Sequence, residues 1–160
     1  AFDLLAVVAE EAAQAGAEVT QADVLPPFQA QERLIRRAIR NLLENALRYG
    51  RSPVEVVVVR HAEEAEIQVL DRGPGVPPAL AERIFEPFYR LPGHAESEGG
   101  VGLGLSLVRQ IAQHHGGRVQ VTPREGGGSC FSLRLPMSRP MGLPMSPPAA
   151  NSAAATRAQG

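Results

Sequence analysis

The sequence predicts an α/β (α+β) fold, a two-layer sandwich with helices on one face of a mixed, mainly antiparallel sheet. Amphipathic stretches with helical spacing alternate along the chain with β-branched runs of strand length. The last four of these runs form two pairs, each separated by a short polar or glycine-rich connection. Hairpin-linked strands lie antiparallel, and helices that cover a single sheet face complete two layers.

The chain begins with a predicted helix over Ala1–Ala15, which Gly16 ends. No capping residue is obvious at its start, so we expect the chain to be a fragment that begins within a longer protein. A strand is predicted over Glu18–Leu25, and the pair Pro26-Pro27 breaks it.

The longest helix is predicted from about Gln31 to Tyr49, where apolar residues recur every three or four positions. Gly50 follows, and we expect it to end the helix in the left-handed conformation.

A polar stripe lies beside the apolar face of this helix and consists of Arg37, Asn41, Asn45 and Arg48. Asn is unfavourable inside helices because its side chain competes for backbone hydrogen bonds. Its carbonyl oxygen can ligate a hard cation such as Mg²⁺. From this stretch alone, a cation site and a solvated face with neutral residues both stay open.

Two strands follow at Val54–Arg60 and Glu66–Asp71, joined by a hairpin loop at His61–Ala65. A forced turn over Arg72–Gly75 comes next, and Pro78–Phe85 predicts a short helix.

The second half of the chain repeats the alternation. Leu91–Gly99 is polar and predicts a mobile loop, and Leu105–His115 predicts an amphipathic helix. Two final strands, Arg118–Thr122 and Ser129–Leu135, are joined by a glycine-rich turn at Gly126–Gly128.

The composition limits the class of protein. We expect one domain over residues 1–137, with a motif-bearing core at 31–136, and a disordered tail over 138–160, where Pro, Met, Ser and Ala dominate. The net charge of −1 predicts no nucleic-acid partner. No apolar run approaches the ~18 residues that span a bilayer.

Two residue types narrow the chemistry. All 16 basic residues are arginine, which excludes P-loop proteins, eukaryote-type protein kinases and Schiff-base chemistry, because each needs a lysine. The single cysteine, Cys130, excludes an intramolecular disulfide and is expected to be a small core residue.

Four separated segments carry the candidate site. Asn41 and Asn45 offer a cation site, Asp71 ends a strand before a Gly-x-Gly turn, and Gly99–Gly104 opens a helix whose free N–H groups favour phosphate. Gly126–Ser129 adds a further small-residue segment. A dinucleotide-binding Rossmann motif does not fit, because a loop precedes the helix glycines and their spacing is wrong.

In this order, five segments resemble the N, G1, F, G2 and G3 boxes of bacterial sensor histidine kinases, in the GHKL superfamily of gyrase, heat-shock chaperone, histidine kinase and MutL. The segments are Asn41–Gly50, Asp71–Val76, Ile84–Arg90, Gly100–Val108 and Gly126–Pro136. The resemblance implies the Bergerat (GHKL) ATP-binding fold and the cofactors ATP and Mg²⁺.

The resemblance also implies residue roles. Asn45 ligates Mg²⁺ and bridges it to the phosphates, Arg48 contacts phosphate, and Tyr49 packs by the adenine. Asp71 accepts the adenine amino group, and Ser129 supports it through water. The implied nucleotide-binding residues are Asn45, Tyr49, Asp71, Gly73, Gly75, Val76, Phe88, Gly100, Val101, Gly102, Leu103, Gly104, Leu105 and Ser129.

For catalysis the resemblance makes Leu91–Gly99 the ATP lid and brings Arg90 to the γ-phosphate, because a planar guanidinium suits phosphoryl charge. The implied catalytic residues are Asn41, Arg48 and Arg90.

Two departures from the family pattern matter. Val101 stands where a threonine is usual, which removes a hydroxyl near the phosphates. The acidic residue that is usual just before the long helix is either replaced by Gln31 or absent. No His-Glu-x-x-Thr-Pro phosphoacceptor motif exists, and none of His61, His94, His114 and His115 is expected to be the acceptor.

We therefore expect the γ-phosphoryl group to pass to a histidine on a separate dimerisation domain of the same kinase, and from there to a response regulator. The chain is expected to be monomeric and unable to phosphorylate itself, and the full-length kinase homodimeric. Its location is expected to be cytoplasmic, in a protein anchored in the bacterial inner membrane.

Two alternatives stay open. Hydrolytic GHKL ATPases place a Glu base one turn before the Mg²⁺-binding Asn, where this chain has Asn41, and Glu44 points about 100° away from Asn45. Hydrolysis is therefore disfavoured. An anti-sigma-type kinase directed at Ser or Thr is the other alternative.

Overall fold

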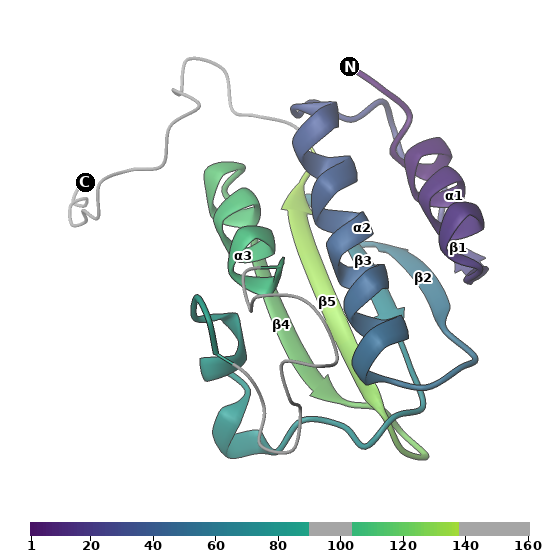
Figure 1. Ribbon diagram of the computed structural model, residues 1–160. Coiled ribbons are helices and arrows are strands. Elements are labelled where there is room, and N and C mark those ends of the chain that lie inside the picture. Colours follow the sequence, from purple (N-terminus) through teal and green to yellow (C-terminus); the bar gives the residue numbers. More distant parts are fainter. Residues whose placement is uncertain (90–103, 138–160) are drawn as a thin grey trace.

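The computed structural model describes residues 1–89 and 104–137, which form a five-stranded sheet with α-helices packed on one of its faces (Figure 1). The helices are α1 (Leu4–Ala15), α2 (Glu32–Tyr49) and α3 (Gly104–His114), with 3₁₀ turns η1 (Pro78–Leu80) and η2 (Arg83–Phe85). The strands are β1 (Glu18–Ala22), β2 (Glu55–Arg60), β3 (Glu64–Leu70), β4 (Arg118–Pro123) and β5 (Ser129–Pro136).

The strand order across the sheet is β1-β2-β3-β5-β4. β1 pairs with β2 in parallel, because α2 forms the crossover between them, and every other neighbouring pair is antiparallel. The predicted two-layer sandwich with a mixed, mainly antiparallel sheet is therefore confirmed.

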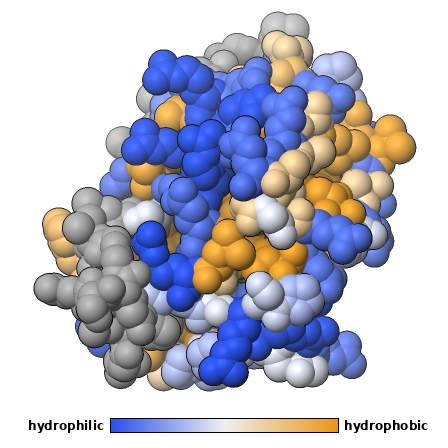
Figure 2. All heavy atoms as spheres, turned by 45° about the vertical axis from the view of Figure 1, so that its right-hand side comes forward, coloured by the Kyte–Doolittle hydropathy of each residue, from blue (hydrophilic) through white to orange (hydrophobic). Residues whose placement is uncertain are grey.

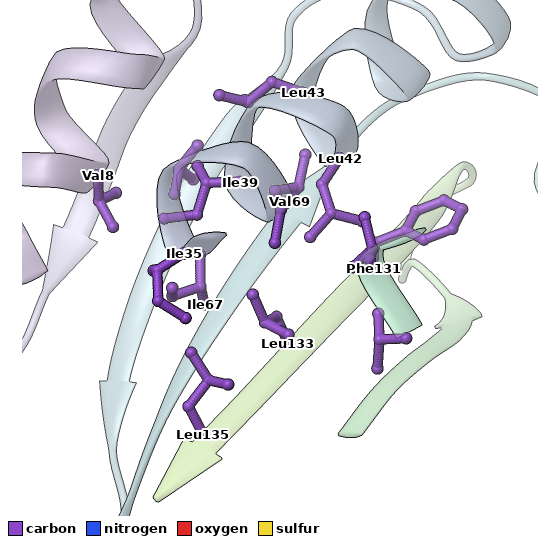
Figure 3. Close-up of a cluster of buried hydrophobic side chains, with 14 of the residues drawn as sticks. Val8, Ile35, Ile39, Leu42, Leu43, Ile67, Val69, Phe131, Leu133 and Leu135 are labelled. Carbon is purple, nitrogen blue, oxygen red and sulfur yellow. The ribbon is translucent and has the colours of Figure 1, made fainter. Parts of the chain in front are cut away.

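The hydrophobic core lies between the helices and the inner face of the sheet (Figure 3). Alternate strand residues meet the apolar face of α2, because side chains alternate across a strand and recur every third or fourth position on a helix. The buried side chains include Val8, Ile35, Ile39, Leu42, Leu43, Ile67, Val69, Phe131, Leu133 and Leu135. This packing fixes α2, and with it the polar stripe, against the sheet.

The N-terminal helix differs from the prediction. It begins at Leu4, and Asp3 caps it, because an Asp3 side-chain oxygen accepts from the backbone N–H of Ala6 at 3.3 Å. The expectation of an uncapped start was wrong. Phe2 is held instead by Phe28, through backbone hydrogen bonds in both directions and edge-to-face rings.

Several predicted boundaries also shift. β1 ends at Ala22, short of the two prolines, and the predicted helix over Pro78–Phe85 is two separate 3₁₀ turns. The loop between β2 and β3 shrinks because His61 N–H donates to Glu64 O at 2.8 Å. The predicted lid and tail lie outside the described residues.

Cys130 does not join the core between the layers. It is half-buried and pairs with Leu70 in the β3–β5 register, next to the inward-facing Phe131, so it lies on the sheet face that carries no helix. Burial raises the pKa of its thiol.

Ion pairs join α1 to α2, on the side of the molecule that Figure 2 brings forward. Arg36 and Arg40 of α2 both bind Glu11 of α1. Figure 2 shows a mainly hydrophilic surface interrupted by hydrophobic patches. Within residues 1–89 and 104–137, no helix has the length and apolar character that crossing a bilayer requires.

Candidate functional site

The polar stripe of α2 lies beside the start of α3. Asn41 and Asn45 are half-buried, whereas Arg37 and Arg48 are exposed. The amide Nδ2 of Asn41 donates to the backbone oxygen of Gly104 at 3.3 Å. The structure thus brings together two segments that are 63 residues apart in sequence.

Asp71 lies at the end of β3 and is buried, with 3% of its surface exposed. Its backbone N–H donates to Ser129 O at 3.0 Å, and its Oδ1 accepts from the backbone N–H of Gly73 at 2.8 Å. Among the residues that the structure describes, no hydrogen bond reaches its second oxygen, Oδ2. An unpaired buried acceptor is costly, which makes Oδ2 a candidate for a ligand donor.

Glycines surround Asp71 because no side chain fits there. A Cβ on Gly50 would lie 2.5 Å from Asp71 Cγ, and one on Gly73 would lie 2.6 Å from the Cα of Gly50. Gly128 has φ +107°, and its Cβ would overlap the backbone oxygen of Asp71. Gly50, Gly73 and Gly128 form a glycine cradle that lets three chain segments approach the backbone and side chain of Asp71.

Gly50 has a different role from the predicted one. Its backbone is extended, with φ −92° and ψ −156°, so it does not end α2 in the left-handed conformation. Sequence reasoning also missed Gly128 as a packing residue of the Asp71 site. No local signal distinguishes these glycines from ordinary turn residues, because the atoms that exclude a Cβ come from distant segments.

Gly75 and Ser129 lie next to Gly128 of the glycine cradle. Gly75 has φ +83°, and its Cβ would lie 3.3 Å from Gly128 O and 4.0 Å from the Ser129 hydroxyl oxygen. Ser129 is buried, and Val76 packs against the core. The structure therefore places both glycine turns around Asp71.

Other predicted site residues are less closely grouped. Tyr49 is half-buried at the end of α2, Gly104 opens α3, and Leu105 packs against the core. Phe88 is 69% exposed with a positive φ of 66°, so the described structure does not bury it with the Asp71 cluster.

Part of the predicted site lies outside the described residues. The affected positions are Arg90, Gly100, Val101, Gly102 and Leu103, together with the predicted lid Leu91–Gly99.

The donor set fits a nucleotide-bound Mg²⁺ ion. Asn45 offers a neutral side-chain oxygen, a hard ligand of the kind that Mg²⁺ accepts. Within residues 1–89 and 104–137, no cluster of three or more His, Cys, Asp or Glu side chains is placed to hold a metal. A cation at Asn45 would therefore take most of its ligands from phosphate and water, as Mg²⁺ commonly does.

Comparison with known families identifies the fold. Residues 30–139 match the sequence profile of histidine kinase-, DNA gyrase B- and HSP90-like ATPases. This match covers more than half of the chain. The chain belongs to this ATPase family. The resemblance inferred from the five boxes is thereby confirmed, as are the GHKL fold and ATP as the bound nucleotide.

Relatives and solved structures narrow the family to its kinase branch. Adaptive-response sensory kinase SasA of Rippkaea orientalis is 42% identical over 118 residues, 72% of this chain and 30% of that protein. Sensor protein RstB of Escherichia coli is 46% identical over 106 residues, 66% of this chain and 24% of that protein. The ATP-binding domain of PrrB from Mycobacterium tuberculosis is 28% identical, with a TM-score of 0.68 over 86% of this chain and 96% of that chain.

The chain is a histidine-kinase ATP-binding catalytic domain, and the alternative of a hydrolytic GHKL ATPase is not favoured. It spans about 30% or less of the length of these two sensor kinases. The residues that match the ATPase family, 30–139, include all five predicted boxes.

Proposed function

We propose that this domain binds Mg²⁺–ATP and donates the γ-phosphoryl group to a histidine on a dimerisation domain of the same kinase. The observation that carries the proposal is the buried Asp71 carboxylate, whose Oδ2 has no partner among the described residues while glycines keep side chains away from it. Such an acceptor selects a ligand that presents a hydrogen-bond donor.

Adenine is the base that suits this acceptor. Its exocyclic amino group donates to Asp71, whereas guanine presents a carbonyl oxygen at the corresponding position. A carbonyl facing a buried carboxylate would leave both groups unpaired, at a cost of roughly 1–3 kcal/mol. Gly75 and Ser129, which lie near Asp71, would face the edge of the ring and an ordered water.

The phosphates would lie toward α2 and the start of α3. Asn45 would hold Mg²⁺, which neutralises phosphate charge when bound, while Arg48 contacts a phosphate and Tyr49 packs by the adenine. Free N–H groups at the start of α3 favour anions, so Gly104 and the glycines before it suit this end of the nucleotide. We extend the proposal to Arg90 at the γ-phosphate and Leu91–Gly99 as the lid on the resemblance alone.

Transfer is favoured over hydrolysis because the described part of the site, residues 1–89 and 104–137, offers no suitable base for water. Asn41 occupies the position of the hydrolytic Glu, and its amide donates to Gly104 O. Glu44 is exposed and lies on another side of α2 from Asn45. Phosphoryl transfer needs positioning and charge neutralisation rather than covalent help from the protein.

The partners of the domain follow from the proposed separation of ATP binding, on this chain, from the acceptor histidine, on another domain. We propose a histidine-bearing dimerisation domain, a homodimeric full-length kinase that is anchored in the inner membrane, and a downstream response regulator. This chain alone, with its domain over residues 1–137, is proposed to be monomeric.

Labelled ATP tests the proposal. The chain alone should acquire no stable label, and adding the histidine domain of the parent kinase should give an acid-labile, base-stable phosphoramidate. Arg90→Ala should reduce transfer more than ATP binding. Stable labelling of the chain alone on any of its own histidines would overturn the proposed roles.

A further inference from the structure

Two arginines join the turn after β3 to the turn between β4 and β5. Arg72 of the first turn and Arg124 of the second each donate hydrogen bonds to backbone oxygens of the opposite segment. We propose that Arg72 and Arg124 are positioning residues, which hold the Asp71 backbone so that its carboxylate selects adenine. Neither needs to touch the nucleotide. The inference rests on the adenine-binding role proposed for Asp71.

Arg124 connects the end of β3 to β2. Its side chain is only 10% exposed; Nη1 donates to Asp71 O at 3.3 Å, and Nη2 forms an ion pair with Glu55 Oε2 at 3.2 Å. Hydrogen bonds from a charged donor are stronger than neutral ones, and burial removes competing water. Arg124 thus fixes the carbonyl group of the residue whose side chain faces the base.

Arg72 makes the reciprocal connection. Its Nη1 donates to the backbone oxygens of Glu125 and Gly127, at 3.0 and 3.1 Å. A Cβ on Gly126 would lie 3.0 Å from the same nitrogen, so the glycine turn closes directly over the guanidinium group. Arg72 and Arg124 therefore form a reciprocal latch between the G1 segment and the turn between β4 and β5.

The latch leaves Asp71 little freedom. Its N–H donates to Ser129 O and its carbonyl accepts from Arg124, while the N–H of Arg72 donates to Arg51 O at 3.0 Å. Only the side-chain torsions remain, and the Gly73 N–H holds Oδ1. Because hydrogen-bond strength falls steeply with misalignment, a backbone shift at Asp71 would weaken base recognition.

The test measures ADP and GDP affinity by calorimetry, well below the melting temperature, for Arg124→Leu and Arg72→Leu. Each variant should bind ADP about five- to tenfold more weakly and should lose a similar factor of ADP-over-GDP preference. Arg118→Leu is the matched control. Arg118 is also ion-paired, but it begins β4, beside Glu64, whereas Arg124 directly follows the end of β4. Arg118→Leu should change neither quantity.

Two further variants separate positioning from general stability. Arg124→Lys keeps the charge and should recover part of the base preference. In an Asp71→Asn background, Arg72→Leu should cause no further loss of ADP affinity, because the arginine acts through Asp71. If Arg124→Leu does not fold, the exposed Arg72 still provides the test.

The outcomes distinguish the two proposals. Native protein that does not bind ADP would refute the nucleotide site itself. Native protein that prefers ADP, together with folded Arg72→Leu and Arg124→Lys proteins that keep native ADP affinity and base preference, would refute the latch.

Discussion

Glu11 and Asp71 are both buried, with 2% and 3% of their surface exposed. They differ in how many hydrogen bonds the described residues donate to their carboxylate oxygens. Glu11 Oε1 accepts from Arg40 Nε at 2.9 Å and Glu11 Oε2 accepts from Arg36 Nη1 at 3.2 Å. Arginines of α2 therefore bind both oxygens of this carboxylate. The side-chain carboxylate of Asp71 accepts one hydrogen bond, from the Gly73 N–H, among the described residues.

The difference in hydrogen bonding indicates that Glu11 has a structural role, whereas Asp71 is a candidate for ligand binding. The hydrogen bond from Arg40 lowers the pKa of Glu11, and burial opposes this only in part. Glu11 therefore stabilises the contact between α1 and α2, remote from the glycine cradle. Asp71 Oδ2, which has no hydrogen-bond partner among the described residues, gains such stabilisation only when a donor arrives. We therefore expect a substitution at Glu11 to lower the free energy of unfolding and to leave nucleotide affinity unchanged. A substitution at Asp71 should mainly lower nucleotide affinity.

The largest expected effect concerns ligand-induced stabilisation. Saturation of the native protein with Mg²⁺–ATP at a hundredfold over the dissociation constant should stabilise it by ~2.7 kcal/mol, seen as a rise in melting temperature. Asn45→Ala should largely abolish this shift, whereas Glu11→Gln should retain it. An unchanged shift in the Asn45→Ala protein would refute the Mg²⁺ assignment.

Affinity should respond next, at Asp71. Asp71→Asn replaces an acceptor oxygen with a donor that faces the adenine amino group, so ATP affinity should fall at least about tenfold, or ~1.4 kcal/mol. Calorimetric titration with ATP and GTP measures both affinity and base preference. Equal binding of ATP and GTP by native protein would contradict the role of this carboxylate.

Unfolding stability should change at Glu11. Glu11→Gln removes the charge between two guanidinium groups, both partly exposed and able to recover hydration, so the free energy of unfolding should fall by about 1–2 kcal/mol. Urea denaturation measures this loss, and ATP titration should give native affinity. A weakened ATP affinity with native stability would reverse the comparison.

The smallest expected effect is a loss of folding stability at acidic pH. Glu11 contributes to it, and so does a third buried acid, Glu66. Burial raises the pKa of Glu66, but hydrogen bonds with Ser132, His61 and Gln68 outweigh it, so the folded pKa lies below the ordinary value of a glutamate. Stabilisation is therefore full above about pH 5 and is lost as pH falls through the lowered pKa.

Denaturation curves between neutral and acidic pH test this dependence. Glu11→Gln and Glu66→Gln should each flatten the decline of stability on the acid side, because one carboxylate no longer takes up a proton on unfolding. An acid slope identical to the native one in both variants would show that these acids do not carry the dependence.

Local pattern was sufficient for most elements and for the residues of the polar stripe. Helical spacing over residues 31–49 and strand alternation after Pro53 depend on neighbours within a few positions, so the sequence alone specifies them. The five boxes predict that Asp71 and Asn45 belong to one nucleotide site. The two 3₁₀ turns were missed because proline-bounded short segments resemble short helices.

Contacts between distant segments were decided only by tertiary structure. Glu11 meets Arg36 and Arg40 across 25 and 29 residues, and Arg124 meets Asp71 across 53. Gly50 shows the same limit, since its sequence position predicts a helix end but its missing Cβ makes room for Asp71. The sequence of each segment specifies the helix or strand that it can form. Whether a buried charge has a partner depends on the distant segments that the packed sheet and helices bring beside it.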